Sequence, residues 1–382
     1  MKPLRVAIAG GGVCGLGIGW HLAKAGAEVL LFDRARAARG ATWASAGMLA
    51  PQMELQPEEE GIMLLGRESL RRWRGFARQL EQASGVELDY RDEGALFVAL
   101  DRDGIRQLQF LHDHQRELGL PVQWLSGDEA RQREPYLSRR VVAGLYSPDD
   151  HQVDPRALAV ALIAAFTRVG GRIHEDAPVE RILVEGGRAT GVRVRGEEIL
   201  ADAVLLAAGA WSGMVEGLLP RVSIPIRPVK GQMIAVRQPA RPILDHCVWA
   251  RDNTRTVYLA PKSDGRLLIG ATVEEVGFDT QVTVGGVLDL LGIAWETLPG
   301  LYDLPIVETW AGLRPSSRDN APILGKTAID GLYLATGHYR NGILFAPVTA
   351  EDVSHLMMTG ETTDAIAPFA LERFFAGDAA RA

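Results

Sequence analysis

Residues near the N-terminus have the types and spacing that bind a dinucleotide. Gly10, Gly12 and Gly15 form the pattern G-x-G-x-x-G, with Val13 and Cys14 between the last two glycines. In such a turn the first glycine permits a tight bend, the second lets the backbone approach a pyrophosphate, and the third lets the helix pack on the strand. Free N–H groups at the start of the helix attract the phosphates. We therefore expect all five residues to lie at a dinucleotide site.

The flanking segments predict the elements that this turn requires. Apolar runs at residues 4–9 and 28–32 predict two buried strands, and residues 16–25 predict the helix between them. Asp33 closes the second strand, about where an acid binds ribose hydroxyls, and it disfavours the 2′-phosphate of NADP. Asp33 does not distinguish NAD from FAD. The small-residue stretch at 39–48, which replaces a regular strand and helix, suits a longer cofactor and favours FAD.

Further along the chain, apolar periodicity and capping residues predict the remaining elements. Helices are expected at 58–83, at 103–118, after the cap Asp154 and from about 343 to 358. Strands are expected at 94–100, 203–208 and 332–335, with a hairpin over 179–194. Between residues 225 and 276, short strand-like segments at 232–236, 256–259 and 267–270 alternate with Pro, Gly and Asp. That section is typical of an antiparallel sheet in a second domain.

Composition excludes several classes of protein. The formal net charge of −7 argues against a nucleic-acid partner, which needs a basic surface. Two cysteines, Cys14 and Cys247, form neither a disulfide framework nor a metal cluster, so we expect no metal and a cytoplasmic location. The apolar run after Arg5 could belong to a signal peptide, but its glycine spacing favours the nucleotide-binding turn. No apolar run is long enough to predict stable insertion in a membrane.

Five blocks of sequence resemble one family of flavoenzymes, and they occur in the same order as in that family. They are the glycine turn, Ala46-Gly47-Met48-Leu49-Ala50-Pro51, Leu206-Ala207-Ala208-Gly209-Ala210-Trp211-Ser212, Trp310-Ala311-Gly312-Leu313-Arg314-Pro315 and Gly337-His338-Tyr339-Arg340-Asn341-Gly342-Ile343-Leu344. Together they are similar to the D-amino acid oxidase superfamily of FAD-dependent amine oxidoreductases, and within it to glycine oxidases of thiamine biosynthesis.

The resemblance implies a mixed α/β fold of two domains. A Rossmann-like FAD-binding domain would be assembled from the discontinuous segments 1–84, 150–222 and 314–382. A substrate-binding domain built on an antiparallel sheet would comprise 85–149 and 223–313. A homo-oligomer, such as a tetramer, is also implied.

The resemblance further implies which residues contact FAD. Besides the glycine turn and Asp33, they are Arg34, Thr42, Ala46, Gly47, Met48, Val179, Ala208, Gly209, Trp211, Gly337, His338, Arg340, Asn341, Gly342 and Ile343. The second glycine turn, Gly337 to Gly342, precedes a helix whose N-terminus would stabilise negative charge on the reduced flavin. Neither cysteine stands where relatives attach flavin covalently, so we expect non-covalent FAD.

Four residues resemble those around the substrate. Arg314 resembles the arginine that binds the substrate carboxylate, for which a planar guanidinium is well suited. Tyr258 resembles the tyrosine that supports the same carboxylate, Arg340 a second arginine near the flavin, and Met48 a residue that lines the pocket. Each also has a structural alternative, as a surface arginine, a sheet tyrosine, an arginine bound only to protein or a core methionine. Val273 departs from a bulkier methionine in some relatives, which would admit sarcosine or D-alanine beside glycine.

The implied reaction is oxidative deamination of glycine, and of sarcosine or small D-amino acids. Hydride passes from Cα to flavin N5, dioxygen becomes hydrogen peroxide, and the imine hydrolyses to glyoxylate and ammonia or supplies the thiazole of thiamine. The protein would bind and orient the cofactor that does this chemistry. A D-amino acid dehydrogenase, a sarcosine or secondary-amine oxidase, a non-catalytic FAD-binding protein and an NAD-linked dehydrogenase remain alternatives.

Overall fold

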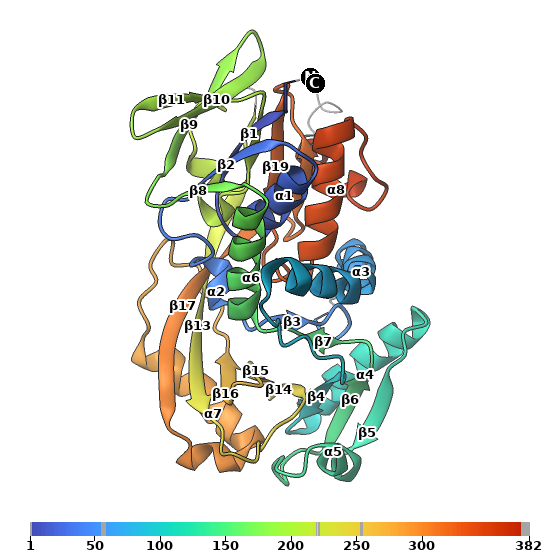
Figure 1. Ribbon diagram of the computed structural model, residues 1–382. Coiled ribbons are helices and arrows are strands. Elements are labelled where there is room, and N and C mark those ends of the chain that lie inside the picture. Colours follow the sequence, from blue (N-terminus) through green and yellow to red (C-terminus); the bar gives the residue numbers. More distant parts are fainter. Residues whose placement is uncertain (1, 55–58, 219, 221, 253–254, 376–382) are drawn as a thin grey trace.

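Two large β-sheets organise the part of the chain that the computed structural model describes, residues 2–54, 59–218, 220, 222–252 and 255–375. In the view of Figure 1 the six-stranded sheet lies above the eight-stranded sheet. Strands of the upper sheet come from both ends and from the middle of the chain, so segments far apart in sequence lie side by side there.

The six-stranded sheet contains the apolar runs that the sequence predicts as buried strands. Its spatial order is β18 (Ile323–Lys326), β19 (Leu332–Thr336), β12 (Ala203–Leu206), β1 (Arg5–Ala9), β2 (Glu28–Phe32) and β8 (Arg172–His174). All neighbours are parallel except β18 and β19. Strands predicted at 4–9, 28–32, 203–208 and 332–335 are confirmed within a residue or two at each end.

The eight-stranded sheet confirms the antiparallel character predicted for 225–276. Its spatial order is β17 (Ile306–Ser317), β13 (Ile226–Arg237), β16 (Arg266–Gly270), β15 (Thr256–Pro261), β14 (Cys247–Arg251), β4 (Ala95–Ala99), β6 (Ala143–Ser147) and β5 (Gln123–Ser126). Only β14 and β4 pair in parallel. Strand β13 begins at Ile226, before the segment predicted at 232–236. Pro228 is tolerated in this early part because β13 pairs there with β17 alone, so the missing N–H of the proline leaves no bond to a second strand unmade.

Four helices share one hydrophobic core with the six-stranded sheet. They are α1 (Val13–Lys24), α3 (Glu60–Ser84), α6 (Pro155–Arg168) and α8 (Ala346–Thr359). Helices α1, α6 and α8 pack against the sheet, and α3 packs on two of these helices, α6 and α8. The stripe predicted on α3 is confirmed: Trp73, Phe76 and Leu80 are fully buried, and Leu70 packs against the same core. Residue 58, where this helix was expected to begin, lies outside the described residues.

Local rules explain where these helices begin. The side chain of Asp154 caps α6 as predicted and accepts the Arg156 N–H at 2.7 Å. Helix α1 begins at Val13, slightly earlier than predicted, since its glycines are tolerated in a well-packed helix. The predicted start of α8 at 343 is wrong. The helix begins at Ala346 because Pro347 is acceptable only in a first turn.

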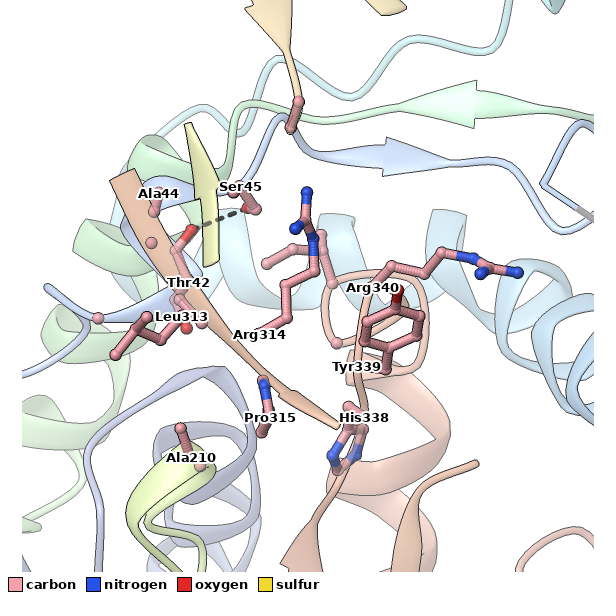
Figure 2. A pocket seen from close by; sticks show the side chains of 18 of the residues that line it. Thr42, Ala44, Ser45, Ala210, Leu313, Arg314, Pro315, His338, Tyr339 and Arg340 are labelled. Carbon is pink, nitrogen blue, oxygen red and sulfur yellow. Dashed lines mark hydrogen bonds between the residues drawn. The ribbon is translucent and has the colours of Figure 1, made fainter. Parts of the chain in front are cut away.

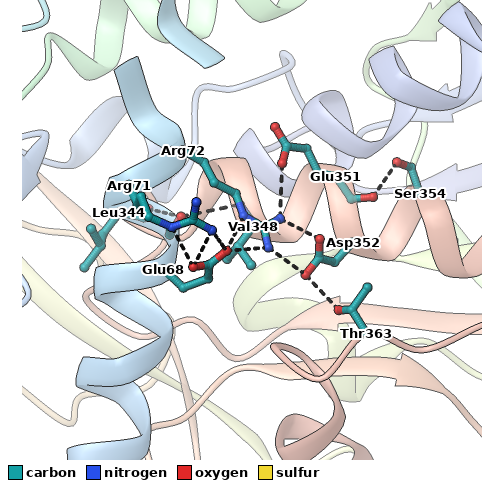
Figure 3. Close-up of polar contacts among 10 residues, drawn as sticks. Glu68, Arg71, Arg72, Leu344, Val348, Glu351, Asp352, Ser354 and Thr363 are labelled. Carbon is teal, nitrogen blue, oxygen red and sulfur yellow. Dashed lines mark hydrogen bonds and ion pairs between the residues drawn. The ribbon is translucent and has the colours of Figure 1, made fainter. Parts of the chain in front are cut away.

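A polar network joins α3 to α8 beside this core (Figure 3). Arg72 on α3 donates to Asp352 Oδ1 at 2.6 Å and to Glu351 Oε2 at 3.1 Å, both on α8. Glu68, one turn earlier on α3, accepts from Arg72 Nε at 2.8 Å, and Thr363 donates to Asp352 at 2.8 Å. Asp352 is buried and the other charged groups are partly buried, so the network helps to fix α3 against α8, the helix that follows the second glycine turn.

The remaining elements connect or cover the sheets. They are α2 (Ala41–Ala44), α4 (Arg102–Glu117), α5 (Gly127–Arg133), α7 (Val284–Thr297), β3 (Met48–Leu49), β7 (His151–Gln152), β9 (Val179–Glu185), β10 (Arg188–Val194), β11 (Glu197–Leu200) and the 3₁₀ turns η2 (Gly209–Met214), η3 (Pro299–Asp303), η4 (Ala367–Phe369) and η5 (Leu371–Phe374). The hairpin predicted over 179–194 is confirmed as β9 and β10. Helix α4 agrees with its prediction within a residue, whereas α5 and α7 were not predicted.

The predicted domain boundaries stay a prediction. Strand β17 runs through the boundary expected between 313 and 314, so Arg314 belongs to the eight-stranded sheet. Across the described residues, no helix combines the length and apolar character needed to cross a bilayer.

Candidate active site

A cavity of about 1750 Å³ runs from the first glycine turn to the inner face of the eight-stranded sheet. Both Gly12 and Arg314 line it, so the predicted dinucleotide site and the predicted carboxylate site share one space. Pockets for compact ligands usually measure about 300–1,000 Å³. This cavity is large enough for a long nucleotide together with a small second ligand.

The glycine turn has the close contacts that its sequence predicts. A Cβ on Gly10, whose φ is +109°, would lie 2.3 Å from the Ala207 carbonyl oxygen. A Cβ on Gly15 would lie 2.0 Å from the Gly10 carbonyl oxygen. Gly12 instead faces open space, with Thr42 Oγ1 at 3.5 Å as the nearest atom. Gly12 has no side chain that could cap α1, and the Val13 N–H donates to Thr42 Oγ1 at 3.0 Å, so the other free N–H groups of the first turn can receive a phosphate.

Asp33 braces this turn as well as lining the cavity. Its Oδ2 accepts the Gly11 N–H at 2.8 Å and its Oδ1 accepts the Ala35 N–H at 2.9 Å. Burial raises the pKa of this carboxyl group, and the two backbone bonds oppose the rise. Next to it, the guanidinium of Arg34 lies 4.2 Å from the Trp211 ring centroid. This end of the cavity therefore combines an acceptor for hydroxyl groups with a stacked aromatic wall.

Most of the predicted cofactor residues line the cavity. Those that do are Gly10, Gly12, Val13, Cys14, Asp33, Arg34, Thr42, Ala46, Gly47, Met48, Val179, Ala208, Gly209, Trp211, His338, Arg340, Gly342 and Ile343. Gly15, Gly337 and Asn341 are not among the lining residues. Gly15 permits the helix contact described above, and Gly337 adopts a φ of +75°. Asn341 is buried, and its backbone carbonyl accepts the Phe345 N–H at 2.9 Å.

Two side chains beside the second glycine turn, His338 and Cys14, carry no charge near neutral pH. Burial lowers the pKa of His338 to about 4, so its imidazole is neutral. The His338 Nε2 atom lies 3.0 Å from Thr349 Oγ1 and 3.5 Å from Cys14 Sγ. Burial also raises the pKa of the Cys14 thiol to about 12. The two residues therefore form a neutral wall between the two glycine turns.

Arg314 projects from β17 into the cavity (Figure 2). Its Nη1 donates to the Thr272 carbonyl at 3.0 Å and to the Lys230 carbonyl at 3.3 Å. Gly231 lies under the guanidinium and leaves room for it. These contacts aim one side of the planar fork at the backbone and leave the charge facing the cavity.

Tyr258 lies next to Arg314 on the same sheet. Its hydroxyl donates to Met233 Sδ at 3.0 Å. Burial raises the pKa of this phenol, and the positive charge of Arg314 partly opposes the rise. The hydroxyl is therefore protonated and can act as a hydrogen-bond donor. Both residues are brought together as the sequence predicts.

Arg340 is placed differently from Arg314. Its Nη2 donates to the Glu54 carbonyl at 2.9 Å and to the Glu59 carboxylate, and its Nε lies 3.4 Å from Glu54 Oε2. Figure 2 shows its side chain pointing away from that of Arg314. These contacts match the structural alternative for Arg340, an arginine that binds other protein groups. Arg340 also lines the cavity.

Glu54, Lys230 and Gly231 are site residues that sequence reasoning missed. Glu54 lines the cavity; burial raises its pKa, while the charges of Arg340 and Arg314 lower it. Lys230 is fully buried, and its Nζ lies 3.0 Å from Glu274 Oε2 and 3.1 Å from the Gln281 carbonyl. It ties down the segment after β16 that offers the Thr272 carbonyl to Arg314. The sequence did contain a signal for Glu54, because this acidic residue closely follows the 46–51 block that was predicted to line the site.

Met48 and Val273 lie at the edges of the same cavity. Met48, on β3, is partly buried and packs against the core that contains Phe97 and Trp249. Val273 lines the cavity but is 66% exposed. A side chain this exposed restricts the substrate weakly.

Comparison with known proteins identifies the family of the chain. The model of the family described as FAD dependent oxidoreductase matches residues 5–356. Glycine oxidase of Geobacillus kaustophilus is 36% identical over 96% of both chains, and its crystal structure superposes with a TM-score of 0.89, covering 97% of this chain and 99% of that one. A bifunctional protein ThiO/ThiG of Synechocystis sp. is 36% identical over 97% of this chain and 54% of its own length. The chain therefore belongs to the FAD-dependent oxidoreductase family.

Proposed function

We propose that the protein is a glycine oxidase that converts glycine to its imine, with FAD as the electron acceptor and dioxygen as the final oxidant. The observation that carries the proposal is the guanidinium of Arg314. It faces the cavity, and within the described ranges no carboxylate lies at ion-pairing distance from it. A small carboxylate would supply the missing partner. Glycine oxidases among the relatives support the substrate.

The residues present fit FAD, which would accept the hydride from the substrate Cα when it is bound. The open cradle at Gly12 and the first turn of α1 would hold the pyrophosphate, and Asp33 would bind the ribose. The turn from Gly337 to Gly342 would lie at the flavin end. His338 and Cys14 would offer a neutral surface there, which leaves the backbone N–H groups to interact with the ring.

The chain's own residues would bind and orient glycine. Arg314 would bind the carboxylate through its fork, while the Tyr258 hydroxyl donates to the same group. The carbonyls of Thr272 and Lys230 hold the guanidinium in place, so less entropy is lost on binding. Arg340 would neutralise Glu54, whose negative charge would otherwise repel a carboxylate. Released imine hydrolyses in water to glyoxylate and ammonia.

Purified protein assayed for peroxide tests this proposal. We expect a yellow protein that releases hydrogen peroxide with glycine in air, with sarcosine, D-alanine and D-proline compared by kcat/KM. Oxidation of glycine with a quinone acceptor but without peroxide would indicate a dehydrogenase instead. Bound flavin that no small amino acid bleaches without oxygen would indicate a non-catalytic protein, and a colourless protein that FAD does not reconstitute would contradict the proposal.

The proposal extends to the setting of the reaction. We propose a cytoplasmic homo-oligomer whose imine product supplies thiazole formation in thiamine biosynthesis. The bifunctional relative, in which the matched region shares a chain with a second part, supports a link to a following step. Exposed apolar residues on α7, Val284, Leu288 and Trp295, support self-association. Light scattering of the purified protein measures the oligomeric state.

A further inference from the structure

Two backbone carbonyls hold the guanidinium of Arg314, and both belong to residues that contact Glu274. The Arg314 Nη1 atom donates to the Thr272 carbonyl at 3.0 Å and to the Lys230 carbonyl at 3.3 Å. The Lys230 carbonyl also accepts the Glu274 N–H at 3.0 Å, and the Lys230 N–H donates to the Glu274 carbonyl at 2.8 Å. The Thr272 hydroxyl donates to Glu274 Oε1. Glu274 is therefore bonded to both residues that orient Arg314.

Thr272 lies beyond the end of β16, where strand pairing no longer holds the chain. The last pair between β13 and β16 is Met233 with Gly270. Gln232, which precedes Met233 on β13, donates its N–H to Thr272 Oγ1 at 2.9 Å instead of to a strand carbonyl. The position of the Thr272 carbonyl therefore depends on side-chain bonds and not on the regular ladder of the sheet.

The carboxylate of Glu274 collects three side-chain donors at this point. Its Oε1 accepts Gln232 Nε2 at 2.8 Å in addition to the Thr272 hydroxyl, and its Oε2 lies 3.0 Å from Lys230 Nζ. Burial would raise the pKa of Glu274, but the hydrogen bonds from Thr272, Gln232 and Lys230 lower it below its ordinary value. The carboxylate is therefore charged near neutral pH. The buried ammonium of Lys230 neutralises it, which reduces its repulsion of a substrate carboxylate.

We propose that Glu274 is a positioning residue of the carboxylate site. It fixes the carbonyls of Thr272 and Lys230, and through them the direction in which the guanidinium of Arg314 faces the cavity. The inference rests on the proposed function, because Arg314 must bind the substrate carboxylate. A guanidinium that is already oriented loses less entropy when it binds a ligand, so Glu274 raises the affinity for glycine through Arg314.

Binding of an unreactive carboxylate tests this role without turnover. Methoxyacetate has the size of sarcosine and carries no amine that could be oxidised. We expect isothermal titration of the FAD-loaded enzyme to give a Kd about tenfold higher in E274Q, which loses the negative charge opposite Lys230. The Kd should be about two- to tenfold higher in T272V, which loses one hydroxyl group and its hydrogen bonds. T272S restores the hydroxyl and should recover most of the affinity that T272V loses.

A neighbouring acid on the same segment provides the matched control. Glu275 pairs with Arg227 Nε at 3.1 Å, and neither residue is among those that line the cavity. E275Q removes the same charge one residue further along the chain, so it should bind methoxyacetate as the wild type does.

Glycine kinetics separate positioning from a general effect on the fold. Because the carboxylate is held in the ground state and the transition state alike, E274Q and T272V should raise KM for glycine by the same factors as Kd. The kcat and the FAD content should stay within about twofold of the wild type. In an Arg314→Ala background, T272V should change kcat/KM by less than about twofold, since the guanidinium through which Thr272 acts is absent.

These measurements can contradict the role of Glu274 separately from that of the oxidase. Unchanged Kd values in FAD-loaded T272V and E274Q would overturn the positioning role, as would an effect of T272V that is equally large in the Arg314→Ala background. If E274Q does not fold, T272V and T272S decide the question. An enzyme whose Kd values follow the expected pattern but which oxidises no amine would support the role of Glu274 and contradict the proposed function.

Discussion

The backbone of Gly231 lies against the guanidinium of Arg314. A Cβ on Gly231 would lie 2.5 Å from both terminal nitrogens of that arginine. The register pairs Arg314 with Val229, two residues earlier on β13, so the arginine side chain extends along β13 and crosses Gly231. The position of the charge in the cavity therefore depends on a missing side chain on the neighbouring strand.

Replacing Gly231 with alanine should displace Arg314. The added methyl group overlaps the guanidinium, so the bonds to Thr272 and Lys230 cannot both form. We expect KM for glycine to rise about tenfold or more, the cost of one charge-assisted contact, with FAD content unchanged. Peroxide kinetics measure the effect. Gly75→Ala is the control, because a Cβ there meets nothing within 4 Å.

Removing the guanidinium itself should have a larger effect. Arg314→Ala deletes the carboxylate contact and should cost about 1.5–3 kcal/mol, which raises KM for glycine about 10- to 100-fold. Arg314→Lys keeps the charge but loses the planar fork and should lie between. The visible spectrum should still show bound flavin in both variants. A KM near the wild-type value in Arg314→Ala would remove this residue from the proposed site.

Features set by local chemistry were predictable from the sequence. The close contacts of Gly10 and Gly15 follow from a spacing of a few residues, and Asp154 caps α6 by the ordinary rule. The start of α8 was equally predictable, because Pro347 excludes an earlier one. Helix α7 was missed although Thr283 caps it, because glycines in its first turn hide the apolar pattern.

Contacts across the chain were not predictable in the same way. Arg340 reaches Glu54 and Glu59 across more than 280 residues, and no local pattern distinguishes it from an arginine that faces a ligand. Gly231 and Arg314 likewise meet only because β13 pairs with β17 in one register. Resemblance identified Arg314 and Tyr258 as a pair, but the carbonyls that aim the guanidinium depend on tertiary packing.

Asp154 should be a main determinant of stability. It caps α6 and also pairs with the buried guanidinium of Arg266, which has Asp264 as a second partner. Asp154→Ala removes the cap and weakens the neutralisation of Arg266, so the free energy of unfolding should fall by about 3 kcal/mol. Asp154→Asn should lose less, since its amide oxygen can still cap. Denaturant titration measures both, and Ser126→Ala, at the exposed cap of α5, should cost about 1 kcal/mol.

His338 should make the protein sensitive to acid. Its pKa is lowered in the fold from 6.5 to about 4, so the unfolded chain binds a proton more readily than the native protein. The stability from neutral His338 is fully present above pH 6.5 and is lost as the pH falls towards 4, at most about 3 kcal/mol. His338→Gln should flatten the fall in Tm over this window. Part of the fall in Tm should remain in this variant, because burial also lowers the pKa of His21 to about 4.

A surface histidine provides the control for this measurement. His355 is exposed near the end of α8, so His355→Gln should leave the pH dependence of Tm as in the wild type. A fall in Tm between pH 6.5 and 4 that is identical in His338→Gln and the wild type would contradict the assignment to His338.

The chemistry of Cys14 predicts that FAD is held without a covalent bond. Cys14 lines the cavity beside the first glycine turn, so its thiol faces the space that a bound cofactor would fill. Burial raises the pKa of the Cys14 thiol to about 12 and that of the Cys247 thiol to about 12. Both thiols therefore stay protonated and are poor nucleophiles. Precipitation with acid should therefore release all yellow colour into the supernatant, from the wild type and from Cys14→Ser alike. Colour that stays with the wild-type pellet but leaves the Cys14→Ser pellet would show instead that burial does not suppress this thiol.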